Sequence, residues 1–185
     1  MAARAFITGL EGLTLSANER AFLRDSRPWG LIIFKRNVST PDQVTELIQS
    51  FRDIAGSETP VLVDQEGGRV QRLRPPYWRT FPAGREYGQL KTNDPLYRRE
   101  ITRLGGRLLA HDLRDLGVNV DCIPVLDVPS PGGHDIIGDR AYGEDVETVA
   151  TLGRAAQSMT WTVLILCTSS GPANRHTPGT MAACA

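Results

Sequence analysis

The order of apolar segments restricts most strongly what this chain of 185 residues can fold into. Continuous apolar runs occur at Gly30–Phe34 and Pro60–Val63, and two further strands are expected at the short β-prone run Ala5–Thr8 and at Val118–Pro124. Uninterrupted rather than alternating hydrophobicity is typical of strands that are buried on both faces. Because helical patterns lie between these runs, the order predicts parallel βαβ units.

Start and stop signals mark the predicted helices. Ser16-Ala-Asn-Glu19 fits a capping box, and the helix that it opens should end before Pro28. Thr40-Pro-Asp-Gln43 is a second start signal, and a further helix is expected near Asp145. Between them, the apolar positions of a long amphipathic helix are Ile101, Leu104, Leu108, Leu109, Leu113 and Leu116.

Two architectures satisfy this pattern, a TIM barrel and an open doubly wound sheet. No strand is followed by Gly-x-Gly-x-x-Gly, and no Gly-x4-Gly-Lys-Ser/Thr occurs, which disfavours a phosphate- or nucleotide-binding α/β protein. We therefore expect an α/β fold, a partial TIM (β/α)8-type barrel. A complete barrel typically takes about 250 residues.

Composition narrows the function classes. The 21 basic and 21 acidic residues balance, whereas a nucleic-acid binder needs a basic face. Cys122, Cys167 and Cys184 are far apart, which argues against a disulfide framework or a zinc site. No signal peptide or apolar membrane span is found. These observations predict a cytoplasmic protein without nucleic-acid, membrane or obligate protein partners.

The most informative polar segment is Val63-Asp-Gln-Glu-Gly-Gly-Arg-Val-Gln-Arg72, which directly follows a predicted strand. Ligands of parallel α/β folds bind beyond the carboxyl ends of the strands. Asp64 can accept sugar hydroxyls and Arg72 can donate from a rigid fork. The alternative is a structural salt bridge between Asp64 or Glu66 and Arg69 that braces the Gly-Gly turn.

Asp127 and Arg140 follow in similar positions. Asp127 is as suited to holding a loop as to touching a ligand, and Arg140 could instead pair at the surface with Asp139 or Glu144. The segment from Leu73 to Gln89 is expected to be a loop. His111, His134 and His176 are isolated, so no metal site is predicted, and His111 is interpreted as a packing or surface residue.

Four sequence words together resemble the glycoside hydrolase family 3 β-N-acetylhexosaminidases, the cytoplasmic β-N-acetylglucosaminidases of bacterial cell-wall recycling. They occur in the family's order over residues up to about 156. The words are Trp29-Gly-Leu-Ile-Ile-Phe-Lys-Arg-Asn37, Val63-Asp-Gln-Glu-Gly-Gly-Arg-Val-Gln-Arg72, Ile123-Pro-Val-Leu-Asp127 and Ile137-Gly-Asp-Arg-Ala-Tyr142.

The resemblance implies a TIM barrel that removes terminal β-linked N-acetylglucosamine from muropeptide-type saccharides in peptidoglycan recycling. By position, Asp64, Arg72 and Arg140 look like the sugar-binding residues. Family chemistry is retaining, with an aspartate nucleophile and a histidine–aspartate acid/base pair. No metal or organic cofactor takes part.

The resemblance ends before the catalytic motifs. Residues 1–156 match the N-terminal part of such a barrel, and residues 157–185 form a divergent tail with a possible strand at 162–167. Arg175-His176-x-Pro178-Gly179 partly matches the family's Lys-His-x-Pro-Gly-His-Gly, which makes His176 a further candidate for substrate binding. No catalytic residue can be named. A reading-frame change near Gln157 is one hypothesis for the tail, and a catalytically inactive fragment with residual sugar binding is the alternative function.

Overall fold

The protein is described by a computed structural model that covers residues 3–92, 94–130, 132, 135–158 and 164–165. Its main sheet is parallel and has the strand order β1-β2-β3-β6-β7. These strands are β1 (Arg4–Thr8), β2 (Pro28–Ile33), β3 (Val61–Val63), β6 (Val120–Asp121) and β7 (Leu164–Ile165). The predicted parallel α/β fold is confirmed.

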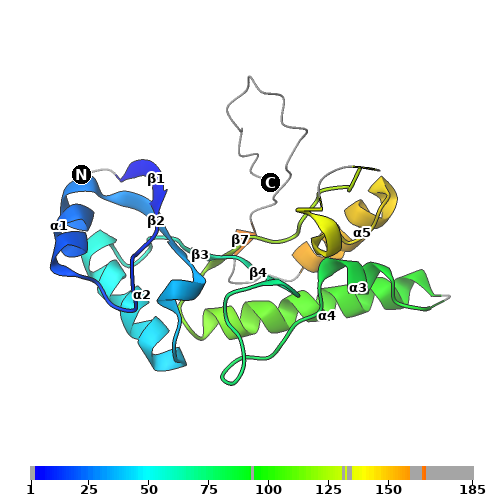
Figure 1. Cartoon of the computed structure of the whole chain (residues 1–185), viewed down its shortest axis with the longest axis horizontal. Helices are drawn as coiled ribbons and strands as arrows, with labels where there is room; N and C mark the ends of the chain where they lie inside the picture. The colour runs from blue at the N-terminus through cyan, green and yellow to red at the C-terminus, as the bar shows by residue number, and fades with distance from the viewer. Residues whose placement is uncertain (1–2, 93, 131, 133–134, 159–163, 166–185) are drawn as a thin grey trace.

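Helices connect the strands in sequence. In Figure 1, α1 and α2 lie at one end of the sheet, and α4 runs beneath it towards α3 and α5. The α-helices are α1 (Ala17–Ser26), α2 (Pro41–Ala55), α3 (Gly84–Gly88), α4 (Pro95–Arg114) and α5 (Val146–Gln157). Two short 3₁₀ helices, η1 (Lys35–Asn37) and η2 (Gly138–Arg140), lie in loops.

The predicted helix starts are confirmed. The Ser16 side chain accepts from the backbone N–H of Glu19, whose carboxylate accepts from the backbone N–H of Ser16 at 2.8 Å. Thr40 caps α2 with Pro41 in its first turn, and Asp145 caps α5. Each cap satisfies backbone donors that have no partner inside the helix, so local sequence fixes where these helices begin.

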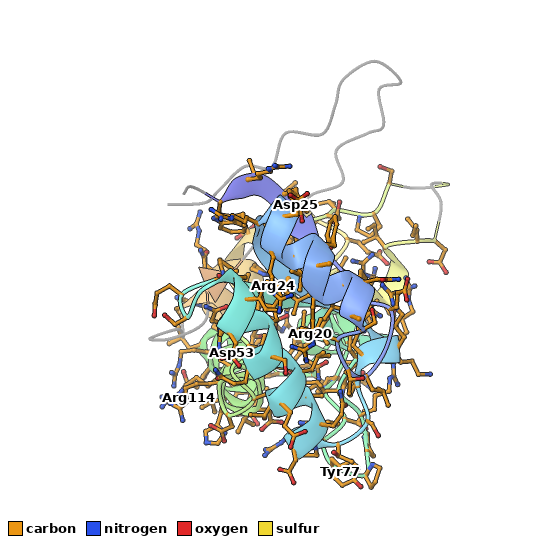
Figure 2. The ribbon with its side chains drawn as sticks, turned by 90° about the vertical axis from the view of Figure 1, so that its left-hand side faces the viewer. Arg20, Arg24, Asp25, Asp53, Tyr77 and Arg114 are labelled. Atoms are coloured by element: carbon orange, nitrogen blue, oxygen red, sulfur yellow. The ribbon has the colours of Figure 1, made fainter. Side chains whose placement is uncertain are left out.

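The main hydrophobic core lies between the sheet and helices α1, α2 and α4. Figure 2 shows α1 and α2 covering this end of the molecule, and the charged side chains of Arg24, Asp25 and Asp53 lie on their outer surfaces. All three residues of β3 are buried, as expected for a strand covered on both faces. The core includes Leu23, Leu31, Ile33, Val44, Leu47, Phe51, Val61, Val63 and Leu113.

The buried face of the long helix α4 agrees only in part with the apolar pattern of the sequence. Leu104 and Leu108, expected to be buried, are exposed. The buried positions are Thr102, Gly105, Gly106, Leu109 and Leu113. Small residues line half of this face because α4 packs closely against its neighbours. The apolar pattern is therefore right at Leu109, Leu113 and Leu116 and wrong at Leu104 and Leu108.

Two elements in the segment after β3 were not predicted. The chain forms an antiparallel hairpin of β4 (Gln65–Gly67) and β5 (Val70–Gln71), and α3 lies inside the stretch expected to be a loop. The two strands and the helix each have at most five residues and carry no hydrophobic period. The division of the chain at residue 157 stays a prediction, because residues 159–163 and 166–185 lie outside the described residues.

In the described parts, no helix has both the length and the apolar character needed to cross a membrane.

Candidate sugar-binding site

The hairpin that follows β3 brings Asp64 and Arg72 together. Asp64 comes directly after the last residue of β3, and β5 returns the chain so that Arg72 lies beside it. The Arg72 Nη2 donates to Asp64 Oδ2 at 2.6 Å. Gly67 and Gly68 form the turn with positive φ, and an added Cβ on Gly67 would lie 2.1 Å from the Pro82 carbonyl oxygen. Glycine at these two positions therefore permits a turn and a close backbone approach that a side chain would prevent.

Arg140 reaches the same strand end from a distant part of the sequence. Its Nε and Nη2 donate to the two carboxylate oxygens of Glu66, each at 2.7 Å. This paired hydrogen bonding raises the pKa of Arg140 above its ordinary value, and the charges of Asp127 and Asp64 act in the same direction. Because a two-point Arg–carboxylate contact fixes the plane of the guanidinium, Glu66 determines where Arg140 points.

The ion pairs that sequence spacing suggested for Arg69 and Arg140 are not formed; both arginines have other partners in the structure. Arg69 contacts neither Asp64 nor Glu66; it donates to Asp139 at 2.7 Å and to backbone carbonyls of the loop before η2. Glu144 bonds to Arg85 at 2.5 Å. The acidic neighbours proposed for Arg140 are thus taken by other arginines, and the partner of Arg140 is Glu66.

Two glycines on one side of α3 allow the loop of Arg140 to approach this helix closely. An added Cβ on Gly84 would lie 2.2 Å from the Arg140 carbonyl oxygen, and one on Gly88 would lie 1.7 Å from that of Tyr142. Tyr142 is itself buried against Tyr87 of α3, with ring centroids 6.3 Å apart. The backbone around Arg140 is therefore packed directly against α3.

The accessible groups of this cluster suit a polyhydroxylated ligand. The side chains of Asp64, Arg72 and Arg140 are 23%, 25% and 21% exposed, so each can still reach a ligand. Glu66 is only 6% exposed, which leaves it a supporting role. A carboxylate that accepts and two guanidinium groups that donate match the hydroxyls and carbonyl of an N-acetylated sugar.

Asp121, a buried carboxyl beneath the cluster, was missed by the sequence analysis. Its side chain lies at the end of β6, where Oδ1 accepts from the backbone N–H of Gln65 at 3.1 Å. Burial raises the pKa of Asp121 well above its ordinary value, and the charges of Glu66 and Asp64 raise it further. The only signal in the sequence was a polar residue inside the apolar run of β6.

The raised pKa of Asp121 predicts a pH dependence of stability. The folded protein holds this proton at pH values where the unfolded chain has released it, so Asp121 makes folding less favourable as pH rises above about 3.9. We expect Asp121→Asn to gain stability relative to wild type across this window, by at most about 1.4 kcal/mol per pH unit.

Urea unfolding of both proteins over a series of pH values measures this difference. Asp121 also interacts electrostatically with Asp64, Glu66, Cys122 and Tyr142. Because wild type and Asp121→Asn share these four groups, their own contributions to the pH dependence of stability cancel in the comparison where Asn leaves them unchanged. Asp25→Asn, at an exposed carboxylate of α1, serves as the control and should show a constant difference. A stability difference for Asp121→Asn that is equally constant would contradict the prediction.

The remaining candidates are placed as follows. Asp127 is buried, and its charge acts on Arg140. His111 is exposed on α4, as interpreted from the sequence. His134 and His176 lie outside the described residues. Within the ranges that the structure describes, no three His, Cys, Asp or Glu side chains gather as metal ligands.

Comparison with known proteins identifies the family. The model of the glycosyl hydrolase family 3 N terminal domain matches residues 6–164. A beta-hexosaminidase of Thioalkalivibrio sulfidiphilus is 39% identical over 143 residues, which cover 77% of this chain and 41% of that protein. One from Bordetella avium is 36% identical over 169 residues, or 91% of this chain and 46% of that protein.

Solved structures agree with this result. The structure of NagZ from Neisseria gonorrhoeae superposes with a TM-score of 0.78 at 29% identity, covering 84% of this chain and 45% of that chain. The same values describe NagZ in complex with N-trifluoroacetyl-D-glucosamine. The predicted partial barrel is confirmed by these neighbours. This chain spans less than half the length of these relatives, and it belongs to glycosyl hydrolase family 3, whose N-terminal domain it contains.

Proposed function

We propose that this chain supplies the sugar-binding part of a retaining β-N-acetylhexosaminidase, which removes terminal β-linked N-acetylglucosamine. Asp64 accepts hydrogen bonds from sugar hydroxyls, and Arg72 and Arg140 donate hydrogen bonds to the sugar. The observation that supports the proposal is the partly exposed Asp64–Arg72 pair directly after a strand of the parallel sheet, in a family 3 domain. Arg140, held by Glu66 of the adjoining hairpin, is close enough for the charge of Asp64 to act on it.

The names of the relatives support the substrate class. Curated relatives are named beta-hexosaminidase, and one neighbouring structure holds N-trifluoroacetyl-D-glucosamine. We extend the proposal to muropeptide-type saccharides as substrates, in cytoplasmic peptidoglycan recycling. The resemblance of the four sequence words supports this extension.

A second candidate function is sugar binding without turnover. Among the described residues, the histidine is His111, which lies on α4 with its imidazole exposed beside Asp115, so it offers no acid/base pair next to Asp64. One measurement distinguishes the two candidate functions. Hydrolysis of a chromogenic N-acetylglucosaminide by this chain requires a nucleophile and an acid/base within it, whereas binding without hydrolysis identifies a binding part alone.

The proposal is tested by titrating the chain with N-acetylglucosamine in a calorimeter. We expect saturable binding by wild type and a loss of about tenfold or more in affinity for Asp64→Ala, because charged hydrogen bonds to a ligand contribute about 1.5–3 kcal/mol each. Asp25→Ala, on the outer surface of α1, should bind like wild type. Absence of wild-type binding at millimolar sugar, or equal binding by Asp64→Ala, would refute the proposal.

A further inference from the structure

The backbone on both sides of Asp64 is held by two consecutive residues of one neighbouring strand end. The carbonyl oxygen of Val63 accepts from the backbone N–H of Cys122 at 3.1 Å. The backbone N–H of Gln65 donates to the Asp121 carboxyl at 3.1 Å. These two bonds flank Asp64, so Cys122 and Asp121 together fix the direction in which its side chain leaves the sheet.

The side chain of Gln65 connects the two strands of the hairpin by hydrogen bonds to the backbone at Arg72 and Leu73. Its Oε1 accepts from the backbone N–H groups of Arg72 at 2.9 Å and Leu73 at 3.0 Å. Its Nε2 donates to the Leu73 carbonyl oxygen at 3.0 Å. Gln65 is almost fully buried, so water does not compete for these bonds. One side chain therefore ties the backbone of Arg72 to the residue next to Asp64.

The Asp121 carboxyl lowers the stability of the folded state, because it is buried and only partly hydrogen-bonded. It is 2% exposed, and its second oxygen, Oδ2, has no hydrogen-bond partner among the described residues. A half-satisfied buried carboxyl weakens the folded state, in contrast to an apolar side chain of similar size. What Asp121 contributes is its contact with the backbone around Asp64: its carboxyl interacts with the backbone N–H groups of Gln65 and Cys122, and the bond to Gln65 leads to the candidate site.

We propose that Asp121 and Gln65 are positioning residues of the sugar site: Asp121 orients the Gln65 peptide, and the Gln65 side chain orients Arg72 so that its guanidinium meets the Asp64 carboxylate. Neither residue touches the sugar. The effect on sugar affinity rests on the proposed function, whereas the effect on the Asp64–Arg72 pair does not.

The test compares Asp121→Ala and Gln65→Leu with two reference variants. Asp121→Asn keeps an oxygen that can accept from the Gln65 N–H, so it should restore what Asp121→Ala loses. Leu152→Ala removes a buried side chain from the cluster of Tyr87, Tyr142 and Ala156, and so lowers stability without removing a hydrogen bond that joins Asp121, Gln65 and Arg72. If Gln65→Leu does not fold, Asp121→Ala still decides, because it leaves the Gln65 side chain in place and removes the carboxyl that accepts from the Gln65 backbone N–H.

Two measurements are made on each folded variant: N-acetylglucosamine affinity by calorimetry, and the nitrogen-15 NMR signals of the Arg72 guanidinium. For Asp121→Ala and Gln65→Leu we expect a loss of affinity of about tenfold or more. We also expect the Arg72 signals to move to those of a solvent-averaged arginine. Asp121→Asn should keep both the affinity and the Arg72 signals of wild type, and Leu152→Ala should keep the Arg72 signals.

The two proposals fail in different ways. If wild type does not bind the sugar, the proposed function fails, and the Arg72 signals still decide whether Asp121 and Gln65 position the ion pair. If Asp121→Ala keeps wild-type Arg72 signals, or if Leu152→Ala loses them equally, the residues only stabilise the fold and the positioning role is overturned. If the signals change while affinity does not, the pair is positioned but the sugar does not use it, which overturns the role in binding.

Discussion

Gly88→Ala is expected to lower the free energy of unfolding by about 3 kcal/mol or more, at the upper end of what overpacking costs. The added methyl would lie 1.7 Å from the Tyr142 carbonyl oxygen and 3.0 Å from its carbon. Both contacts are to backbone, so no side chain can rotate to make room. Either α3 or the segment from Arg140 to Tyr142 has to move, and both belong to the site.

Chemical denaturation measures the change in stability, and calorimetry at a temperature where the variant is folded measures its affinity for N-acetylglucosamine. Movement of the Arg140 segment should weaken the sugar affinity as well. Gly12→Ala is the matched control, because an added Cβ there meets nothing within 4 Å, and its stability should change by no more than about 0.5 kcal/mol. Equal stabilities of the two variants would show that α3 does not press against the loop.

Glu66→Ala is expected to lower the free energy of unfolding by about 2 kcal/mol and to weaken sugar binding. Removal of a buried ion-pair partner costs about 3–5 kcal/mol, and the partial exposure of Arg140 reduces this figure. The guanidinium would lose both of its bonds to carboxylate oxygens and could turn away from the pocket. Glu66 acts on the sugar only through Arg140.

Glu144→Ala is the matched control, because Glu144 also pairs with an arginine near this loop, but its side chain is 76% exposed. An exposed pair contributes about 0–1 kcal/mol, so we expect little change in stability and none in sugar affinity. Denaturation and calorimetry are applied to both variants. If Glu66→Ala and Glu144→Ala behave alike, Glu66 does not hold Arg140 in a functional position.

The sequence predicts most reliably what short-range patterns determine. The Ser16–Glu19 capping box, the Thr40–Pro41 start and the buried strand before Asp64 depend on neighbouring residues, and each is found where the pattern places it. The order of strands and helices also follows, because uninterrupted apolar runs separated by helices leave few parallel arrangements.

What the sequence does not reveal depends on partners that are distant along the chain. Glu66 and Arg140 are 74 residues apart, and Arg69 and Asp139 are 70 apart. Spacing suggested local pairs instead, because it contains no information on which loops meet. Asp121 was overlooked for a related reason, since its bond to Gln65 spans 56 positions and appears only once β6 lies beside β3.

Packing by small residues is the other source of error. Apolar size assigned Leu104 and Leu108 to the core side of α4, whereas the side that packs inward contains Gly105 and Gly106. A glycine gives no hydrophobic signal, so a close helix contact built on glycines is invisible to a periodicity argument. The same applies to α3, whose Gly84 and Gly88 set the position of the Arg140 loop.

A crystal structure of this chain grown with saturating N-acetylglucosamine tests the central claim most directly. The account predicts one sugar at the carboxyl end of β3, with its hydroxyl or acetamido groups within hydrogen-bonding distance of Asp64, Arg72 and Arg140. A sugar bound elsewhere, or an Asp64–Arg72 pair left without ligand while the sugar is at saturating concentration, would contradict it.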